Sequence, residues 1–167
     1  MTVFHCSACG HALTPDLTAL PAVPTVPDLD LARPEGARKA PPTVPRGSYA
    51  IETEPWGAPF VPQEDQDDPV PSQPRGLCRA VGDHGFVISA GPRDTIVVHP
   101  EDASVLQPLP GWANSTGCCG PDGTEGPNRA CPCGARIATL AADCTGPYEL
   151  HLDPLRTRAS TRPDKAG

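Results

Sequence analysis

The chain has 167 residues, a formal net charge of −7 at pH 7, 24 prolines, 16 glycines and only 4% aromatic residues. Its apolar content of 38% lies below the roughly 45–50% of ordinary soluble domains, which excludes a large hydrophobic core and favours loops and short strands over helices. The acidic charge argues against a nucleic-acid-binding protein, which needs a basic face.

The eight cysteines are the second feature of the composition. The N-terminal sequence MTVFHCSACGH has neither the basic start nor the apolar run of a secretory signal, and no apolar stretch has the roughly 20 residues that a membrane helix needs. We therefore expect a cytoplasmic protein that does not associate with membranes. In that reducing compartment, spaced cysteine pairs indicate metal ligands rather than disulfides. A chain with little apolar area also needs another source of stability, and a structural metal is one.

The first 46 residues divide into two predicted parts. Residues 1–14 contain Cys6, Cys9 and Gly10, a tight turn that we interpret as a zinc knuckle, meaning a turn that presents two cysteines to one metal. Residues 15–46 contain eight prolines and are predicted to form a Pro-rich linker or an arm on the surface.

Residues 47–108 are predicted to form a small antiparallel β region, with strands in GSYAIET, GLCRAV, FVISA and TIVVHP and a further strand in ASVLQPL. The fragment ISAGPRDTIVV predicts a hairpin with Gly91 and Pro92 at its tip. Within this region, residues 52–68 are predicted to form a solvated acidic loop; a docking segment for a basic partner is the alternative.

Residues 109–155 form the predicted Cys-rich unit. It ends in two segments, ARIATLAADC and YELHLDP, whose alternation predicts a β-hairpin with Tyr148, Leu150 and Leu152 on one face. Residues 156–167 are polar and are predicted to be a disordered tail. The expected fold is therefore mostly β, with a small antiparallel sheet, a zinc-ribbon-like hairpin and Pro-rich irregular segments.

Two segments, CSACG and CPCG, share a form in which two cysteines precede a glycine. Such a turn can place two sulfurs about 2.3 Å from one metal, and glycine accepts the positive φ that the turn requires. The first hypothesis is that Cys6, Cys9, Cys131 and Cys133 share one zinc. The second is a local site formed by Cys119, Cys131, Cys133 and Cys144. A straight strand over residues 136–143 would carry Cys144 away from Cys133, which favours the first hypothesis.

The remaining cysteines leave a second zinc open. The candidate ligands of such a site are Cys118, Cys119 and Cys144, with His5, His11 or His151 completing the set. Because adjacent side chains diverge, Cys118 and Cys119 are not expected to share one ion. Cys78 lies in an apolar segment and is expected to be a buried thiol.

The two knuckles and the hairpin formed by ARIATLAADC and YELHLDP resemble the zinc-ribbon superfamily over about a third of the chain. The chain departs from a simple ribbon because its knuckles are over a hundred residues apart and the second is Cys-x-Cys. The cysteine pattern CCG–GPN–C–CG–DC is similar to that of uncharacterised actinobacterial proteins, a resemblance that implies no activity.

We see no catalytic constellation, and we therefore expect a zinc-stabilised protein–protein binding module, an adaptor or accessory subunit. A thiol redox or zinc-sensing protein and a nucleic-acid-binding zinc ribbon are the alternatives. Redox pairs normally sit at a helix N-terminus, which lowers the thiol pKa, whereas these pairs lie in Gly-rich turns. The His99-Pro100-Glu101 segment has the H-x-E of zinc deaminases but not the Pro-Cys-x-x-Cys that must follow it.

Overall fold

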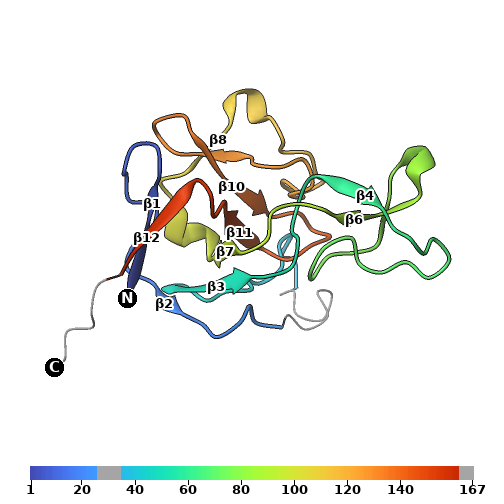
Figure 1. The fold of residues 1–167 in the computed structure, drawn as a ribbon, viewed down its shortest axis with the longest axis horizontal. Coiled ribbons are helices and arrows are strands. Elements are labelled where there is room, and N and C mark those ends of the chain that lie inside the picture. Colours follow the sequence, from blue (N-terminus) through green and yellow to red (C-terminus); the bar gives the residue numbers. More distant parts are fainter. Residues whose placement is uncertain (26–34, 162–167) are drawn as a thin grey trace.

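The computed structural model describes residues 1–25 and 35–161. As predicted, this part of the chain is mostly β, and the helices in it are short 3-10 turns (Figure 1). The strands are β1 (Thr2–Cys6), β2 (Thr18–Ala19), β3 (Ser48–Glu52), β4 (Phe60–Pro62), β5 (Arg79–Ala80), β6 (Phe86–Ser89), β7 (Thr95–Val98), β8 (Gln107–Pro108), β9 (Arg129–Ala130), β10 (Arg136–Ala141), β11 (Glu149–Leu152) and β12 (Thr157–Thr161). The 3-10 helices are Gly82–His84, Pro100–Ala103 and Pro110–Trp112. Within the described ranges, no helix has the length and hydropathy required to cross a bilayer.

A seven-stranded sheet with the order β2-β3-β7-β11-β10-β9-β8 forms the centre of the molecule. Its neighbouring strands are antiparallel except for β2 and β3. The predicted C-terminal hairpin is present as β10 and β11, with Leu140 opposite Leu150. Because β7 pairs with both β3 and β11, the segments 47–108 and 109–155 contribute to one sheet and are not separate units.

The two faces of this sheet bury different side chains, because alternate residues of a strand point in opposite directions. On one face, Ile96, Val98, Leu150 and Leu152 belong to the main hydrophobic core. The N-terminal segment covers this face and contributes Phe4, Leu13 and Leu17 to the same core. On the opposite face, Val97 packs with Val44 and Ala50 in a smaller cluster.

The two ends of the chain meet in a separate two-stranded sheet, in which β1 pairs with β12 and Cys6 lies opposite Thr157 (Figure 1). The prediction of a disordered tail over residues 156–167 is therefore wrong for 157–161, and 162–167 lie outside the described residues. The sequence of β12 misled the prediction because four of its five side chains are exposed. This strand is held in place by backbone pairing with β1. Such pairing produces no hydrophobic pattern in the sequence.

The hairpin predicted around Gly91 and Pro92 is also wrong. Strand β6 pairs with β4 and β5 in a three-stranded sheet, whereas β7 belongs to the central sheet. The connection crosses from one sheet to the other against residues 56–58: the N–H of Trp56 donates to the Pro92 carbonyl at 3.1 Å. A Cβ on Gly91 would lie 2.4 Å from the Trp56 carbonyl oxygen, so glycine is required for this close approach rather than for a tip.

Residues 15–25 and 35–46 lie against the central sheet. Strand β2 adds to its edge beside β3, and the side chains of Leu17, Ala40 and Val44 are buried. The rest of the predicted Pro-rich segment, 26–34, lies outside the described residues. Of the segment predicted as the strand ASVLQPL, residues 103–109, only Gln107 and Pro108 form a strand, β8, and its first residue ends the 3-10 helix Pro100–Ala103.

Candidate metal centre

The first knuckle begins at the last residue of β1. The N–H of Cys6 donates to the His11 carbonyl at 2.9 Å, and the N–H of Gly10 donates to the Cys6 carbonyl at 2.8 Å. Gly10 has a φ of +75°, the left-handed conformation that glycine adopts without a Cβ clash. These bonds turn the chain so that Cys6 and Cys9 project to the same side.

The second knuckle repeats this arrangement with one residue fewer and leads directly into β10. The N–H of Cys131 donates to the Ala135 carbonyl at 2.9 Å, and the N–H of Gly134 donates to the Cys131 carbonyl at 2.8 Å. Gly134 has a φ of +89°, as expected for the glycine after the second cysteine. The shorter Cys-x-Cys spacing therefore gives the same kind of turn.

The two knuckles face each other. The Sγ atoms of Cys6 and Cys133 are 3.8 Å apart, and those of Cys9 and Cys131 are 3.7 Å apart. All four sulfurs lie within 4.8 Å of one another, so they could hold one metal ion. With metal–sulfur bonds of about 2.3 Å, the edge of a regular tetrahedron of sulfurs is about 3.8 Å. The two distances match that edge.

The sulfurs differ in their surroundings. Cys6 and Cys131 are buried in the main core, whereas Cys9 and Cys133 are exposed. The backbone N–H of Ala135, together with the neighbouring thiols, lowers the pKa of Cys133 to about 7. Burial raises the pKa of Cys131 to about 12. A bound cation would favour the thiolate form of all four groups, because metal binding releases the thiol protons.

Strand pairing brings the two knuckles together. Directly after Cys6, the N–H of Ser7 donates to the Arg156 carbonyl at 2.9 Å. Near the start of β10, the Ile137 carbonyl accepts from the N–H of Asp153 at 2.8 Å. Through these bonds, the segment between β11 and β12 connects the end of β1 to the start of β10. The first hypothesis, with ligands from both ends of the chain, is the grouping that the structure brings together.

The chain has no significant match among protein-family models, curated proteins or solved structures. The function must therefore be argued from its own geometry.

The second hypothesis, a local site with Cys119, Cys131, Cys133 and Cys144, is wrong in its grouping. Cys119 and Cys144 lie instead with Cys118, and the three sulfurs are within 4.8 Å of one another. Contrary to the prediction from adjacent side chains, the Sγ atoms of Cys118 and Cys119 are only 4.0 Å apart. Strand β10 lies between the second knuckle and Cys144, and the two cysteine groups are separate, as the strand rise predicted.

The predicted histidine ligands are not at this three-cysteine cluster. Both ring nitrogens of His5 are engaged, with the Gly10 carbonyl at 3.2 Å and the Ser160 hydroxyl at 2.9 Å. His11 is exposed beside the first knuckle. His151 is buried on the central sheet, where both of its ring nitrogens have partners.

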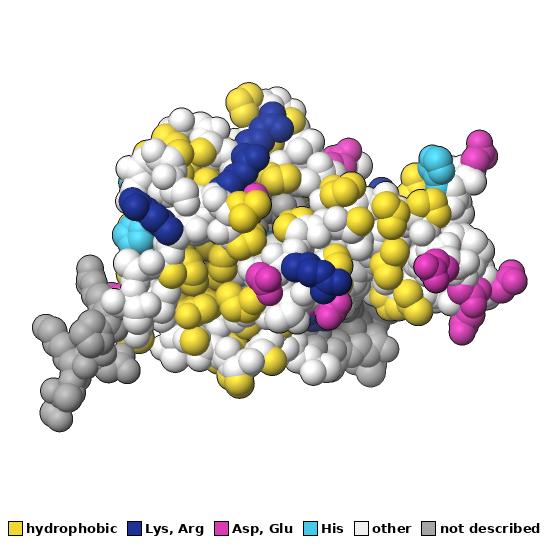
Figure 2. Space-filling model, viewed as in Figure 1, with side chains coloured by type: hydrophobic (Ala, Val, Ile, Leu, Met, Phe, Trp, Pro, Cys, Tyr) yellow, Lys and Arg dark blue, Asp and Glu magenta, His cyan; other side chains and the backbone are white. Residues whose placement is uncertain are grey.

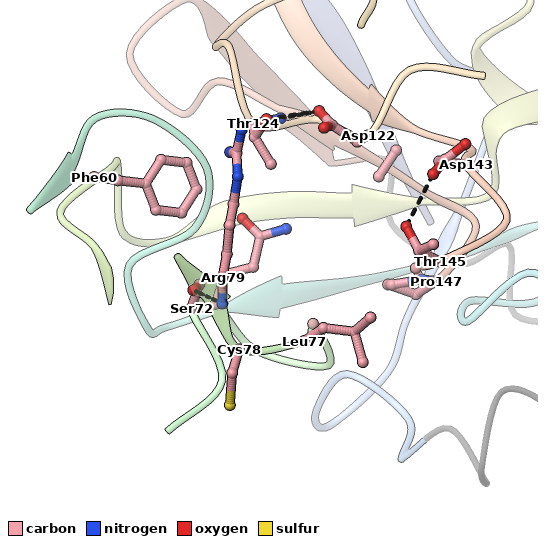
Figure 3. Close-up of a pocket in the computed structure, with 14 residues that line it drawn as sticks. Phe60, Ser72, Leu77, Cys78, Arg79, Asp122, Thr124, Asp143, Thr145 and Pro147 are labelled. Carbon is pink, nitrogen blue, oxygen red and sulfur yellow. Dashed lines mark hydrogen bonds between the residues drawn. The ribbon is translucent and has the colours of Figure 1, made fainter. Parts of the chain in front are cut away.

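Cys78 also differs from its prediction. It is exposed and lies just before β5 rather than within a strand, and its thiol donates to the Pro69 carbonyl at 3.4 Å. Cys78 borders a cavity of about 270 Å³ between the three-stranded sheet and the loops at residues 122–124 and 143–147 (Figure 3). Its sulfur points away from the cavity, whereas Arg79 and Asp143 line it.

A buried polar network on the central sheet was not predicted. Glu149 Oε2 lies 2.8 Å from Nε2 of His151, whose Nδ1 lies 2.8 Å from the Thr95 hydroxyl. Arg75 binds both carboxylate oxygens of Glu149 and also contacts Glu52. The alternation of YELHLDP puts Glu149 and His151 on the face opposite Leu150 and Leu152, and the local sequence does not indicate that this face is buried.

These groups lie in an environment that keeps the carboxylate charged and the imidazole neutral. Burial acts to raise the pKa of Glu149, but His151 and Arg75 hold it down at about 2. Burial also lowers the pKa of His151, whose ring is stacked on Trp56 with centroids 3.5 Å apart. Because an ionised carboxylate only accepts hydrogen bonds, His151 carries its hydrogen on Nε2 and accepts at Nδ1 from Thr95. The network lies on the same face of the sheet as Val97, which is opposite His151 in the pairing of β7 with β11.

Proposed function

We propose that Cys6, Cys9, Cys131 and Cys133 bind one structural Zn²⁺ and that the protein it stabilises is a cytoplasmic protein-binding module or accessory subunit without catalytic activity. The observation that carries the proposal is the four-sulfur cluster, whose separations of 3.7 and 3.8 Å equal the edge of a zinc–thiolate tetrahedron.

The number and type of ligands support a structural role for this ion. Four thiolates in a tetrahedron favour zinc or iron, and four protein ligands leave no position for a substrate or a reactive water. The ion would connect the end of β1 to the start of β10, next to the main core. This long-range connection suits a chain whose apolar content is too low for a large core.

A groove on the three-stranded sheet supports protein binding. It has a volume of about 420 Å³ and includes Val61, Val70 and Ile88, whose side chains are 43%, 52% and 37% exposed. Glu64, Asp65 and Asp68 also line it. Figure 2 shows hydrophobic side chains over this part of the molecule, with Asp and Glu side chains at its outer end.

Charge complementarity favours a basic segment of a partner protein, with an apolar anchor residue, as the occupant of this groove. The apolar side chains would bury the anchor, and the carboxylates would attract Lys or Arg on either side of it. This assignment makes residues 64–68 a docking segment rather than a solvated loop. The same acidic charge would repel the phosphates of a nucleic acid.

The zinc content of protein purified without added metal tests the metal half of this proposal. We expect one tightly held equivalent in the wild-type protein, none at this site in Cys9→Ser, and no change in Cys78→Ser, which alters an exposed cysteine outside both clusters. A wild-type protein that holds less than half an equivalent and whose thiols all react freely while it is folded would overturn the proposal.

Selection from a displayed library of random peptides tests the binding half. We expect selected peptides to combine Lys or Arg with an apolar residue and to lose binding to Ile88→Ser but not to Leu155→Ser, which removes an apolar side chain that is 89% exposed outside the groove. Peptides that bind both variants equally would contradict the groove. Zinc-dependent binding of the wild-type protein to RNA or DNA would instead favour the zinc-ribbon alternative.

A further inference from the structure

We propose that Cys118, Cys119 and Cys144 form a second Zn²⁺ site, which is exchangeable and has a fourth coordination position open to a ligand from outside the chain. The three sulfurs lie within 4.8 Å of one another, and two of them are 4.0 Å apart. Thiolate ligands favour zinc among the common divalent ions. The inference is independent of the four-cysteine site, since the two sites share no residue.

Specific hydrogen bonds hold the two segments of this cluster together. The N–H of Cys119 donates to Asp143 Oδ1 at 2.7 Å, and the Thr145 hydroxyl donates to Asp143 Oδ2 at 2.9 Å. The N–H of Ala142 donates to the Pro121 carbonyl at 2.8 Å. Asp143 therefore fixes the residues on both sides of Cys144 and positions Cys119 across from it. None of these three bonds uses a sulfur atom, so a bound ion would not compete with them, and the fixed backbone would lower the entropy lost on binding.

A glycine permits the close approach of the same segments. A Cβ on Gly120 would lie 2.7 Å from the Ala142 carbonyl oxygen, a distance that real Cβ atoms essentially never show. Any larger residue at position 120 would therefore push the Cys118–Cys119 turn away from the end of β10. The glycine of the Cys-Cys-Gly sequence is therefore required for the close approach of the two segments. Two unrelated surface thiols would not require a glycine at this position.

The cluster differs from the four-cysteine site in ligand number and exposure. Among the described residues, it supplies three metal-binding side chains rather than four. Zinc bound by three protein ligands takes its fourth from water or another molecule. Cys118 is exposed and neither Cys119 nor Cys144 is fully buried, whereas Cys6 and Cys131 are buried. A zinc ion here should therefore exchange faster than one in the four-cysteine site.

The loops of this site also border the cavity in Figure 3. Asp143 and Thr145, which flank Cys144, line it together with Asp122. The figure shows Asp143 and Thr145 joined by their hydrogen bond at its edge. An ion that orders the loop at 143–145 would therefore also order one wall of this space.

Zinc release to a chromophoric chelator, measured on the full chain under fully reducing conditions after loading with Zn²⁺, tests the site. We expect two equivalents from the wild-type protein, one released fast and one slowly. Cys144→Ser should lose only the fast equivalent, Cys9→Ser only the slow one, and Cys78→Ser neither. Asp143→Ala keeps all three thiols and should weaken the fast site by about 10- to 100-fold, the usual effect of removing a group that positions a ligand.

A single, slowly released equivalent in the reduced wild-type protein, or a fast equivalent that persists in Cys144→Ser, would overturn the second site. A disulfide within the cluster that survives the reductant would also overturn it. A wild-type protein that releases only a fast equivalent would contradict the four-cysteine site instead. For the open position, imidazole should change the visible spectrum of Co²⁺ in Cys9→Ser, and an unchanged spectrum would show that the fourth position is closed.

Discussion

The Sγ atom of Cys6 lies 3.8 Å from that of Cys133, although 127 residues separate them in the chain. The pairing of β1 with β12 carries Cys6 to the C-terminal part of the fold, and the second knuckle places Cys133 at the start of β10. A metal bound between them would connect the two ends of the domain.

Replacing Cys9 with serine should lower the free energy of unfolding by the amount that zinc binding at this site contributes. An ion present at 1,000 times its dissociation constant adds about 4 kcal/mol to the stability of the folded state. Urea unfolding at a fixed free zinc concentration measures the difference. Cys78→Ser should unfold like the wild type, and an equal loss in both variants would argue against a site-specific effect.

Gly134→Ala should destabilise the second knuckle through its backbone alone. Nothing lies within 4 Å of a Cβ at this position, but its φ of +89° is unfavourable for alanine. The left-handed conformation costs about 1–2 kcal/mol for a residue with a Cβ. Gly146→Ala is the matched control, because its Cβ would also meet nothing and its φ is ordinary. Equal unfolding free energies for the two variants would contradict the role of Gly134.

Arg75→Ala should destabilise the protein by about 3–5 kcal/mol, because it leaves the fully buried carboxylate of Glu149 without its cationic partner. Arg93→Ala removes a similar side chain from an exposed pair with Glu54 and should change stability by about 1 kcal/mol or less. Chemical denaturation at pH 7 compares the two. A small effect of Arg75→Ala would show that the network contributes little to stability.

Glu149→Gln should reduce stability by about 3 kcal/mol at pH 7, since the folded-state pKa of Glu149 is held at about 2 against an ordinary value of 4.5. A depressed folded-state pKa contributes stability above the unfolded-state pKa, and this contribution is lost as pH falls toward the folded-state value. The difference in stability between wild type and variant should therefore shrink from about pH 5 downward. Zinc release at low pH affects both proteins and cancels when their free energies of unfolding are subtracted. A difference that does not change with pH would contradict a lowered pKa of Glu149 in the folded state.

The sequence allowed the knuckles, the C-terminal hairpin and the mostly β character to be predicted, because each leaves a local signal. CSACG and CPCG have the glycine that the turn requires, and Leu150 and Leu152 show a period of two. The rise of one strand favours the grouping of Cys6 with Cys133 over the nearer alternative.

Other features depend on contacts between distant segments and leave no local signal. Strand β12 pairs through its backbone, so its exposed side chains suggested a disordered tail. Gly91 suggested a hairpin tip, but it is required for close approach to residues 56–58. The approach of the Cys118–Cys119 turn to Cys144 depends on Gly120 and Asp143. The burial of Glu149 depends on Arg75, which is 74 residues away.

Zinc K-edge absorption, recorded after a chelator has removed exchangeable zinc, measures the ligand shell of the four-cysteine site. For the one equivalent that remains, we expect four sulfur neighbours at about 2.3 Å and no nitrogen or oxygen. A shell that includes nitrogen or oxygen, or a protein that retains less than half an equivalent of zinc, would contradict the assignment of Cys6, Cys9, Cys131 and Cys133 as one structural zinc site.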